Sequence, residues 1–175
     1  HQCGACRTRP LALTKVWSLF PYQPPLKEAI TLFKYRGKLS LIQPLAQAMV
    51  EALPTLPTLD AIISVPLHPQ RLREREYNQS LLLADRLSHH TGIPLLLGCL
   101  LRIRPTVPQT SLSRKERLTN LHRAFSVSKP AHIHGKRILL LDDVFTTGTT
   151  LNECARTLRR AGSGQVYGLT LARMV

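Results

Sequence analysis

The stretch Ile138-Leu-Leu-Leu-Asp-Asp-Val-Phe-Thr-Thr-Gly-Thr-Thr150 decides the fold of this chain. Its apolar run is too uniform for a strand with one solvent-facing side, so it predicts a central strand, 138–141, buried on both faces. Asp142 and Asp143 follow at the carboxyl end of that strand, where open α/β sheets place their ligands. Beyond the loop, apolar residues in 151–161 recur at the spacing of a helix with one buried face.

The loop between strand and helix is made of small hydroxylated residues around one glycine: Thr146, Thr147, Gly148, Thr149 and Thr150. A helix N-terminus after such a loop favours an anion, because N–H groups without intrahelical acceptors and the helix dipole both attract negative charge. Carboxylates for sugar hydroxyls beside a phosphate cradle predict a sugar-phosphate site. The alternative is a buried strand that ends in a polar turn, with one Asp capping a helix. The P-loop and dinucleotide-binding motifs are absent.

The stretch resembles the diphosphate-sugar signature of the type I phosphoribosyltransferases, which bind 5-phosphoribosyl 1-diphosphate (PRPP) with magnesium. The resemblance implies an α/β fold with a parallel sheet flanked by helices and a flexible basic lid. It also implies that Asp142 and Asp143 bind the ribose hydroxyls and that residues 146–150 hold the 5-phosphate. Mg²⁺ is the expected cofactor, bound through diphosphate and ribose oxygens rather than by a protein metal site.

The remaining secondary structure alternates between strands and helices, which favours an α/β parallel sheet. Residues 1 to about 25 contain several prolines and are expected to be irregular. The apolar patterns then predict helices at 26–36 and 39–53, a strand at 60–66, a helix at 78–90, a strand at 93–97 and a last strand at 165–172. The segment 102–125 has no clear period.

Length and charge limit the class of protein. The 175 residues, 43% of them hydrophobic, suffice for one domain with a core, and the net charge of +14 predicts a polyanionic partner. That partner could be nucleic acid, a phosphorylated substrate or an anionic membrane surface, and a merely solubilising basic surface is the alternative. No stretch approaches the roughly eighteen apolar residues of a membrane span, and no signal peptide is visible. We therefore expect a cytoplasmic protein.

Two further segments are candidates for the site. Pro66, Leu67, His68 and Arg71 follow the predicted strand 60–66, where phosphoribosyltransferases bind the diphosphate group; an ordinary strand-to-helix loop is the alternative. The segment 102–125 has the composition of a mobile lid whose cations, with Arg102 and Arg104 assigned catalytic roles, could close over the diphosphate leaving group. A basic loop that binds nucleic acid, or binds nothing, is the alternative. Its other cations are Arg114, Lys115, Arg117 and Arg123, against the single acid Glu116.

An ordered set of short motifs sharpens the resemblance. These motifs are Phe33-Lys-Tyr-Arg-Gly-Lys38, Val65-Pro-Leu-His-Pro69, Tyr77-Asn-Gln-Ser80, Gln109 with Arg117 and Asn120, and the signature itself. In this order they resemble the ComF family, phosphoribosyltransferase-like proteins associated with DNA uptake in competent bacteria, with relatives tied to gluconate use. In one departure, Glu76 occupies a position where the family usually has glycine. If that position requires φ > 0, Glu76 is strained and brings negative charge near the diphosphate loop.

The N-terminal segment resembles part of a zinc ribbon. Cys3-Gly-Ala-Cys6 is similar to the second knuckle of the four-cysteine ribbon that family members tend to carry, but a closed zinc site needs four ligands. We therefore expect no ordered zinc in this chain. Cys99 and Cys154 are separate from the pair, and the four cysteines do not make a disulfide framework. The predicted division is a zinc-ribbon remnant at 1–25 and a phosphoribosyltransferase-like domain at 26–175.

The resemblance implies a function in which PRPP and Mg²⁺ are bound and the phosphoribosyl group is transferred to a nitrogen acceptor, in a context of DNA uptake. Asp142 and Asp143 would orient the ribose while the lid arginines assist departure of the diphosphate. The alternative is a non-catalytic PRPP- or nucleotide-binding module that contacts DNA or a partner helicase of the competence machinery. A degenerate scaffold is disfavoured, because a scaffold needs neither the paired carboxylates nor the Thr-rich loop.

Overall fold

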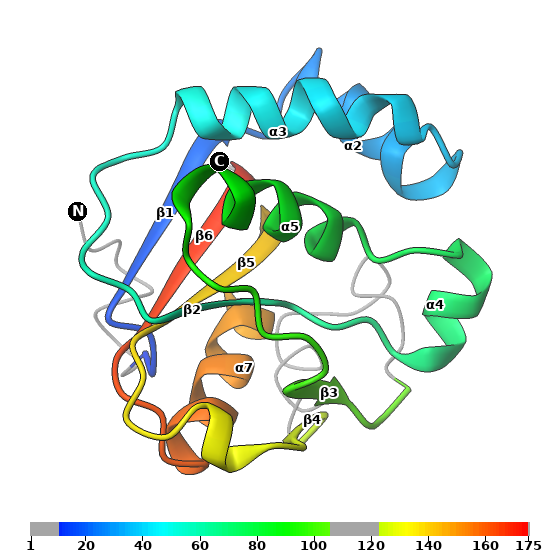
Figure 1. Ribbon diagram of the computed structural model, residues 1–175. Helices are drawn as coiled ribbons and strands as arrows, with labels where there is room; N and C mark the ends of the chain where they lie inside the picture. Colours follow the sequence, from blue (N-terminus) through cyan, green and yellow to red (C-terminus); the bar gives the residue numbers. More distant parts are fainter. Residues whose placement is uncertain (1–10, 106–122, 175) are drawn as a thin grey trace.

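The computed structural model describes residues 11–105 and 123–174. Within these residues, the central sheet has the strand order β1-β6-β5-β2, and all of its neighbouring strands are parallel (Figure 1). The strands are β1 (Lys15–Pro21), β2 (Ala61–Ser64), β5 (Ile138–Phe145) and β6 (Val166–Arg173). The α/β fold with a parallel sheet flanked by helices, as expected from the sequence, is confirmed.

Strand β5 is the centre of the sheet, with β2 on one side and β6 on the other. Its first four side chains are fully buried, as the uniform apolar run predicts. The strand extends four residues further than expected, because its pairing with β6 continues to Phe145 opposite Arg173. Asp142 and Asp143 therefore lie inside the strand, near its carboxyl end, and their backbone is fixed by the sheet.

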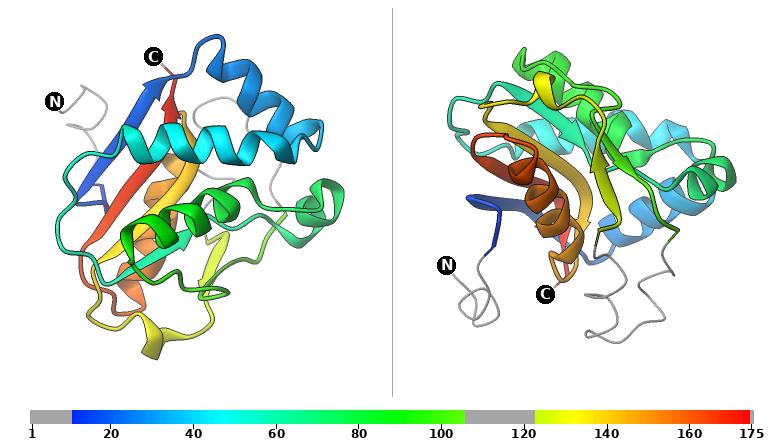
Figure 2. Two further views of the ribbon diagram at one scale, coloured as in Figure 1. Left: turned by 45° about the horizontal axis from the view of Figure 1, so that its top comes forward. Right: turned by 90° about the horizontal axis from the view of Figure 1, so that it is seen from below.

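Helices cover both faces of the sheet (Figures 1 and 2). On one face lie α2 (Leu26–Tyr35), α3 (Ile42–Glu51) and α5 (Gln79–Thr91), whose buried side chains pack with Leu139 and Leu141 of β5. On the other face lies α7 (Thr149–Arg160), whose apolar side packs with Ile138 and Leu140. Alternate residues of β5 thus belong to two separate cores, which is why the strand reads as continuously apolar.

Two of the expected elements are wrong. Residues 15–21, expected to be irregular, form β1, which pairs with β6 along the edge of the sheet. Its side chains are half-buried rather than alternating, so no period marks it as a strand. Residues 93–97, expected to form a strand, make only a single parallel bridge between Leu95 and Ile62. Pro94 supplies a carbonyl to this bridge but has no N–H of its own to donate.

A small antiparallel ribbon stands beside the sheet. It pairs β3 (Leu100–Arg102) with β4 (Phe125–Val127), and Arg102 lies opposite Phe125. The ribbon joins the two ends of the segment expected to form a basic lid. Of that segment only 102–105 and 123–125 belong to the described residues, so Arg114, Lys115, Glu116 and Arg117 lie outside them.

The short connections complete the fold. A 3-10 turn, η1 (Leu39–Leu41), leads into α3, and another, η3 (Pro130–His132), follows β4. Between the predicted strand 60–66 and the predicted helix 78–90, where the sequence indicated no further helix, the chain forms the short helix α4 (Pro69–Arg75). Among the described helices, none is long and apolar enough to cross a membrane.

Candidate functional site

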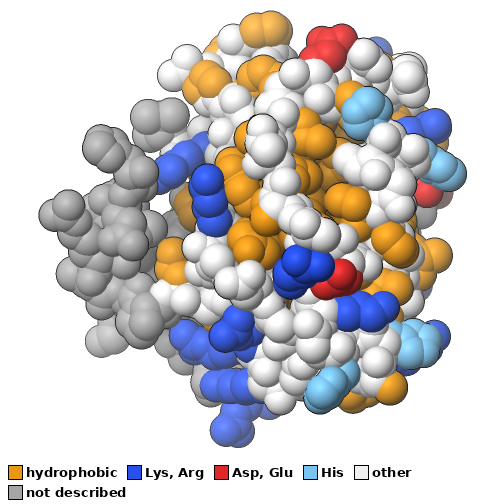
Figure 3. Space-filling model, turned by 60° about the vertical axis from the view of Figure 1, so that its left-hand side comes forward, with side chains coloured by type: hydrophobic (Ala, Val, Ile, Leu, Met, Phe, Trp, Pro, Cys, Tyr) orange, Lys and Arg blue, Asp and Glu red, His pale blue; other side chains and the backbone are white. Residues whose placement is uncertain are grey.

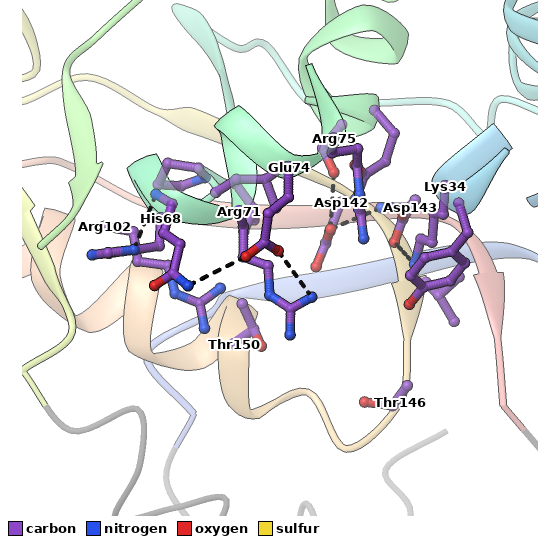
Figure 4. A pocket seen from close by; sticks show the side chains of 18 of the residues that line it. Lys34, His68, Arg71, Glu74, Arg75, Arg102, Asp142, Asp143, Thr146 and Thr150 are labelled. Carbon is purple, nitrogen blue, oxygen red and sulfur yellow. Dashed lines mark hydrogen bonds and ion pairs between the residues drawn. The ribbon is translucent and has the colours of Figure 1, made fainter. Parts of the chain in front are cut away.

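A cavity of about 660 Å³ opens at the carboxyl end of the sheet. Figure 4 shows its wall, to which β5, α2, α4, β3 and the start of α7 all contribute side chains. Most of the residues chosen from the sequence line it together: Pro66, Leu67, His68, Arg71, Arg102, Asp142, Asp143, Thr146 and Thr150. The strand ends, the turn after β2 and the loop before α7 are therefore parts of one site.

Asp142 is held by two donors on its Oδ1 atom. The Ser80 hydroxyl of α5 donates to it over 3.0 Å, and the main-chain N–H of Asp143 donates over 2.9 Å. Burial, followed by repulsion from the neighbouring Asp143, raises the pKa of Asp142 to about 7. Attraction to Lys34 opposes this rise. Asp142 can therefore change protonation near neutral pH, and its hydrogen-bonding role depends on the charges around it.

Asp143 is paired with a lysine from a distant part of the chain. The Nζ atom of Lys34, on α2, lies 2.8 Å from Asp143 Oδ1, and both side chains are largely buried, at 18% and 5% exposure (Figure 4). Burial lowers the pKa of Lys34, but the pair with Asp143 outweighs it and the net shift is upward. Asp143 Oδ2 is buried and has no hydrogen-bond donor among the described residues. A buried carboxylate oxygen without a donor is costly unless a ligand supplies one.

The motif at 77–80 joins three parts of the site. Asn78 caps α5 by accepting the main-chain N–H groups of Ser80 and Leu81, and its amide donates to the carbonyl of Val65 over 3.0 Å. The Tyr77 hydroxyl donates to the carbonyl of Phe33 on α2, and the two rings stack. The motif therefore fixes α2 and the turn after β2 relative to α5.

The turn after β2 leads directly into α4. His68 is the N-cap, and its Nδ1 accepts the main-chain N–H of Gln70 at 3.3 Å. Arg71, on the first turn, lies 3.6 Å from Glu74, and both side chains line the cavity. Because this ion pair is exposed and therefore weak, the Arg71 guanidinium could leave Glu74 and bind a diphosphate at little cost in free energy.

Glu76 adopts the conformation that its glycine-like position implies. It ends α4 with φ of 67°, in the left-handed region, and its N–H donates to the carbonyl of Leu72. Its side chain is exposed and is not among the residues that line the cavity. The expectation for the backbone at this position is therefore confirmed, while the expected effect of the charge on the diphosphate loop stays a prediction.

The Thr-rich loop gives α7 an abrupt start. Gly148 has φ of 73° and precedes the first residue of the helix, Thr149, two residues earlier than the apolar period suggests. A Cβ atom at position 148 would lie 2.5 Å from the ring of Phe145, so glycine is required for space as well as for φ. The Thr147 and Thr149 hydroxyls share a hydrogen bond of 2.8 Å. The side chains of residues 147–149 do not line the cavity; Thr146 and Thr150 do.

The two arginines to which the sequence assigned catalytic roles, Arg102 and Arg104, differ in their position relative to the cavity. Arg102 lines the cavity, and burial lowers the pKa of its guanidinium. Arg104 is exposed and is not among the residues that line the cavity. At the other end of the lid segment, Arg123 donates its main-chain N–H to the buried carboxylate of Glu153 on α7 over 3.2 Å. Both described ends of the segment are thus attached to elements of the site.

Sequence reasoning left Lys34 and Ser80 out of the site, although both belong to motifs that carried the family resemblance. It also left out Arg75, whose guanidinium donates to Gln79 over 2.7 Å and lies 5.0 Å from the ring of Tyr35. All of these side chains line the cavity. The sequence contained one indication of these residues, namely the motifs to which Lys34 and Ser80 belong. The order of the motifs along the chain did not show that their side chains lie together in the folded protein.

Comparison with known proteins identifies the class to which this chain belongs. The family model described as "Phosphoribosyl transferase domain" matches residues 74–173. This match sets the class: the chain contains a phosphoribosyltransferase domain of type I fold. One solved structure, of an "allosteric regulatory enzyme of purine biosynthesis", aligns with a TM-score of 0.49 and 24% identity, over 74% of this chain and 25% of that one.

Curated relatives narrow the class. "Competence protein F" of Haemophilus influenzae is 36% identical over 99% of this chain and 79% of the relative. "DNA utilization protein YhgH" of Salmonella typhi is 33% identical over 98% of this chain and 77% of the relative. "Competence protein ComFC" of Bacillus subtilis is 32% identical over 99% of this chain and 71% of the relative. The chain belongs to the ComF family of phosphoribosyltransferase-like proteins.

Proposed function

We propose that the protein binds PRPP with magnesium in the cavity at the carboxyl end of the sheet and transfers its phosphoribosyl group to a nitrogen acceptor. The observation that carries the proposal is the floor of the cavity. There, two adjacent carboxylates lie on one strand, and the buried Oδ2 of Asp143 has no donor among the described residues. The hydroxyls of a ribose are donors of the required kind.

The remaining walls provide for the charged groups of the same ligand. Arg71 and Arg102 line the side formed by α4 and β3, where a diphosphate would receive charge-assisted hydrogen bonds. Thr146 and Thr150 line the side formed by the start of α7, which suits the 5-phosphate. The family resemblance implies further contacts with the ligand. They would come from Arg104, from the main-chain groups of residues 147–149 and from the other residues of the expected lid.

Magnesium would be held mainly by the ligand. The described residues contain no group of three or more His, Cys, Asp or Glu side chains placed to bind a metal ion. We therefore expect the magnesium ion to arrive with the diphosphate and to keep oxygens of PRPP as its main ligands. The cation would neutralise charge on the leaving group, while Asp142 and Asp143 orient the sugar.

The test is isothermal titration of the protein with PRPP and magnesium. We expect micromolar binding by the wild-type chain and loss of at least about a hundredfold in affinity for Asp142→Asn/Asp143→Asn, because each buried hydrogen bond to a charged group contributes about 1.5–3 kcal/mol. Asp85→Asn is the matched control, since it removes a half-exposed carboxylate on α5 outside the cavity. Absence of binding by the wild-type chain would contradict the proposal. Transfer is then tested by release of diphosphate with a panel of nitrogen acceptors.

A second candidate is a non-catalytic module that binds PRPP or a nucleotide and contacts DNA. It is favoured by the net charge of +14 and by relatives named for competence and DNA utilization. Figure 3 shows one group of Lys and Arg side chains at the lower left of the face in view, with others spread over the rest of that face. Binding of a single-stranded oligonucleotide would then weaken steeply with salt and would be unchanged in Asp142→Asn/Asp143→Asn. Diphosphate release with any acceptor would exclude this candidate in favour of the first.

A further inference from the structure

Lys34 is a cavity residue that the phosphoribosyl-binding signature does not contain. It comes from α2, more than a hundred positions before the carboxylate that it contacts, and its ammonium lies 2.8 Å from Asp143 Oδ1. Figure 4 shows the two side chains pointing toward each other at one end of the cavity wall. The contact leaves the second oxygen of Asp143 facing no donor among the described residues. Lys34 thus holds the Asp143 carboxylate in place but leaves one of its two oxygens without a hydrogen-bond donor among the described residues.

Several elements contribute charged or titratable groups around the neighbouring Asp142. Its own strand contributes Asp143, and the groups from the elements packed against it are Lys34 of α2, Ser80 of α5, Arg102 of β3 and Cys154 of α7. The Cys154 thiol is fully buried, and burial raises its pKa, so it stays neutral at ordinary pH. Arg102 is cationic and interacts with Asp142 through space, but no ion pair joins it to either carboxylate among the described residues. Within the described residues, Lys34 is the cation that forms a direct ion pair with the carboxylate pair.

We infer that Lys34 is a positioning residue of the ribose-binding site: acting through Asp143, it keeps the paired carboxylates able to accept hydrogen bonds from a ligand diol. The inference rests on the proposed function, because it concerns the same site and the same ligand. It assigns to the family motif at 33–38 a role that neither the fold nor the signature supplies.

The physical reason is that burial, together with repulsion from the adjacent Asp143, favours the neutral form of Asp142 and raises its pKa. Two ionised carboxyl groups that share a buried site also repel each other, so one of them takes up a proton more readily, and a cation close by reduces this tendency. A protonated Asp142 would turn one of its acceptor sites for ribose hydroxyls into an O–H donor. The Lys34 ammonium opposes this, and because its own pKa is raised above the usual 10.5, it stays charged throughout the neutral range.

A purely structural role for Lys34 is the alternative. The pair with Asp143 could serve only to attach α2 to the sheet, as Tyr77 does through the carbonyl of Phe33. The two roles differ in their dependence on pH. Loss of an attachment weakens ligand binding by a similar factor at every pH, whereas loss of charge compensation is repaired when the solution is basic enough to ionise both carboxylates.

The experiment is isothermal titration with PRPP and magnesium from pH 6 to pH 9 on the wild-type chain, Lys34→Gln and Lys34→Arg. Gln keeps a donor for Asp143 but removes the charge. For a shift of about one pKa unit, we expect Lys34→Gln to bind about five- to tenfold more weakly at pH 6–7 and within about twofold of wild type at pH 9. Lys34→Arg should restore the wild-type pH profile. The ligand's own ionisation is common to all three proteins and cancels in the ratios.

A double variant, Lys34→Gln/Asp143→Asn, supplies an independent result if Lys34→Gln does not fold. It removes the cation and the repelling carboxylate together, so the pH midpoint of binding should lie within about half a unit of wild type, although overall affinity falls. Weakening of Lys34→Gln by one constant factor at every pH would overturn the inference, as would a displaced midpoint in the double variant. Wild-type protein that binds no PRPP at any pH would instead overturn the proposed function itself.

Discussion

The side-chain amide of Asn78 donates a hydrogen bond to the main-chain carbonyl of Val65, with 3.0 Å between the two atoms. The other end of the same side chain accepts the N–H groups that begin α5. One residue therefore starts a helix and holds the end of β2, where the turn with His68 begins. Because Ser80 on the first turn of α5 contacts Asp142, this link also sets the distance between the turn and the paired carboxylates.

Asn78→Ala should lower the free energy of unfolding by about 1–3 kcal/mol, because it removes an N-cap and leaves a half-buried carbonyl without its donor. Asn78→Asp is the matched control, since Asp caps a helix equally well but cannot donate to Val65. It should recover the part of the loss that belongs to the cap. Urea denaturation of the three proteins measures both parts. Equal stability of Asn78→Asp and wild type would show that the bond to Val65 contributes nothing.

Part of the fold could be predicted from the sequence, because it depends on local periodicity or on residues adjacent in the chain. This part comprises the central strand, the loop before α7 and the helices at 26–35 and 79–91. The paired carboxylates were found for the same reason. Lys34 was not, since its partner Asp143 is distant in sequence and no local pattern links them. Strand β1 was missed because an edge strand with half-buried side chains has no alternation to detect.

The glycine-like position of Glu76 shows what a family pattern can add to physics. The expectation of φ > 0 came from the usual glycine of the family, and the structure has φ of 67° there. Nothing in the local sequence Arg-Glu-Tyr would have indicated a left-handed residue. The expected charge effect on the diphosphate site stays a prediction, because the Glu76 side chain is exposed and is not among the residues that line the cavity.

Glu76→Gly should raise the free energy of unfolding by about 1 kcal/mol, because glycine adopts the left-handed conformation without the steric cost that a Cβ atom brings. Glu76→Ala is the matched control, since it removes the charge and keeps the Cβ atom. It should change stability by less than about 0.5 kcal/mol. Thermal and urea unfolding distinguish the two. A gain of similar size in both variants would assign the effect to charge instead of backbone strain.

Gly148→Ala and Gly92→Ala separate backbone strain from lack of space. Both glycines have nearly equal φ, 73° and 72°, and both lie at a helix end. A Cβ atom at Gly92 meets nothing within 4 Å, whereas one at Gly148 meets the ring of Phe145. We expect a loss of about 1 kcal/mol for Gly92→Ala and of about 1–3 kcal/mol more for Gly148→Ala. Equal losses measured by urea unfolding would mean that the ring moves aside freely.

Acid stability should depend on Asp60, at the opposite end of the sheet from the cavity. Its carboxylate accepts three hydrogen bonds from Arg137, two from the guanidinium at 3.0 and 3.1 Å and one from the main-chain N–H at 2.8 Å. These bonds lower the pKa of Asp60 to about 2. A lowered pKa stabilises the folded state above the ordinary value of 3.8, and this contribution is lost as the pH falls toward 2. The stability of Asp60→Asn relative to wild type should therefore rise as the pH falls from 4 to 2, and a constant difference would contradict this.

Asp142 should act in the opposite direction and in another pH range. Its pKa is raised from 3.8 to about 7, mainly by burial and by Asp143, so its ionisation disfavours the folded state. The neutral form is fully present below about pH 4, and its advantage is lost as the pH rises through about 7. Asp142→Asn does not ionise, so its unfolding free energy relative to wild type should increase between pH 4 and pH 8, by on the order of 2 kcal/mol. Subtraction of the two curves cancels the histidines, which both proteins share. A difference that stays flat across this range, measured by urea unfolding at each pH, would show that Asp142 is ionised in the folded protein well below pH 7.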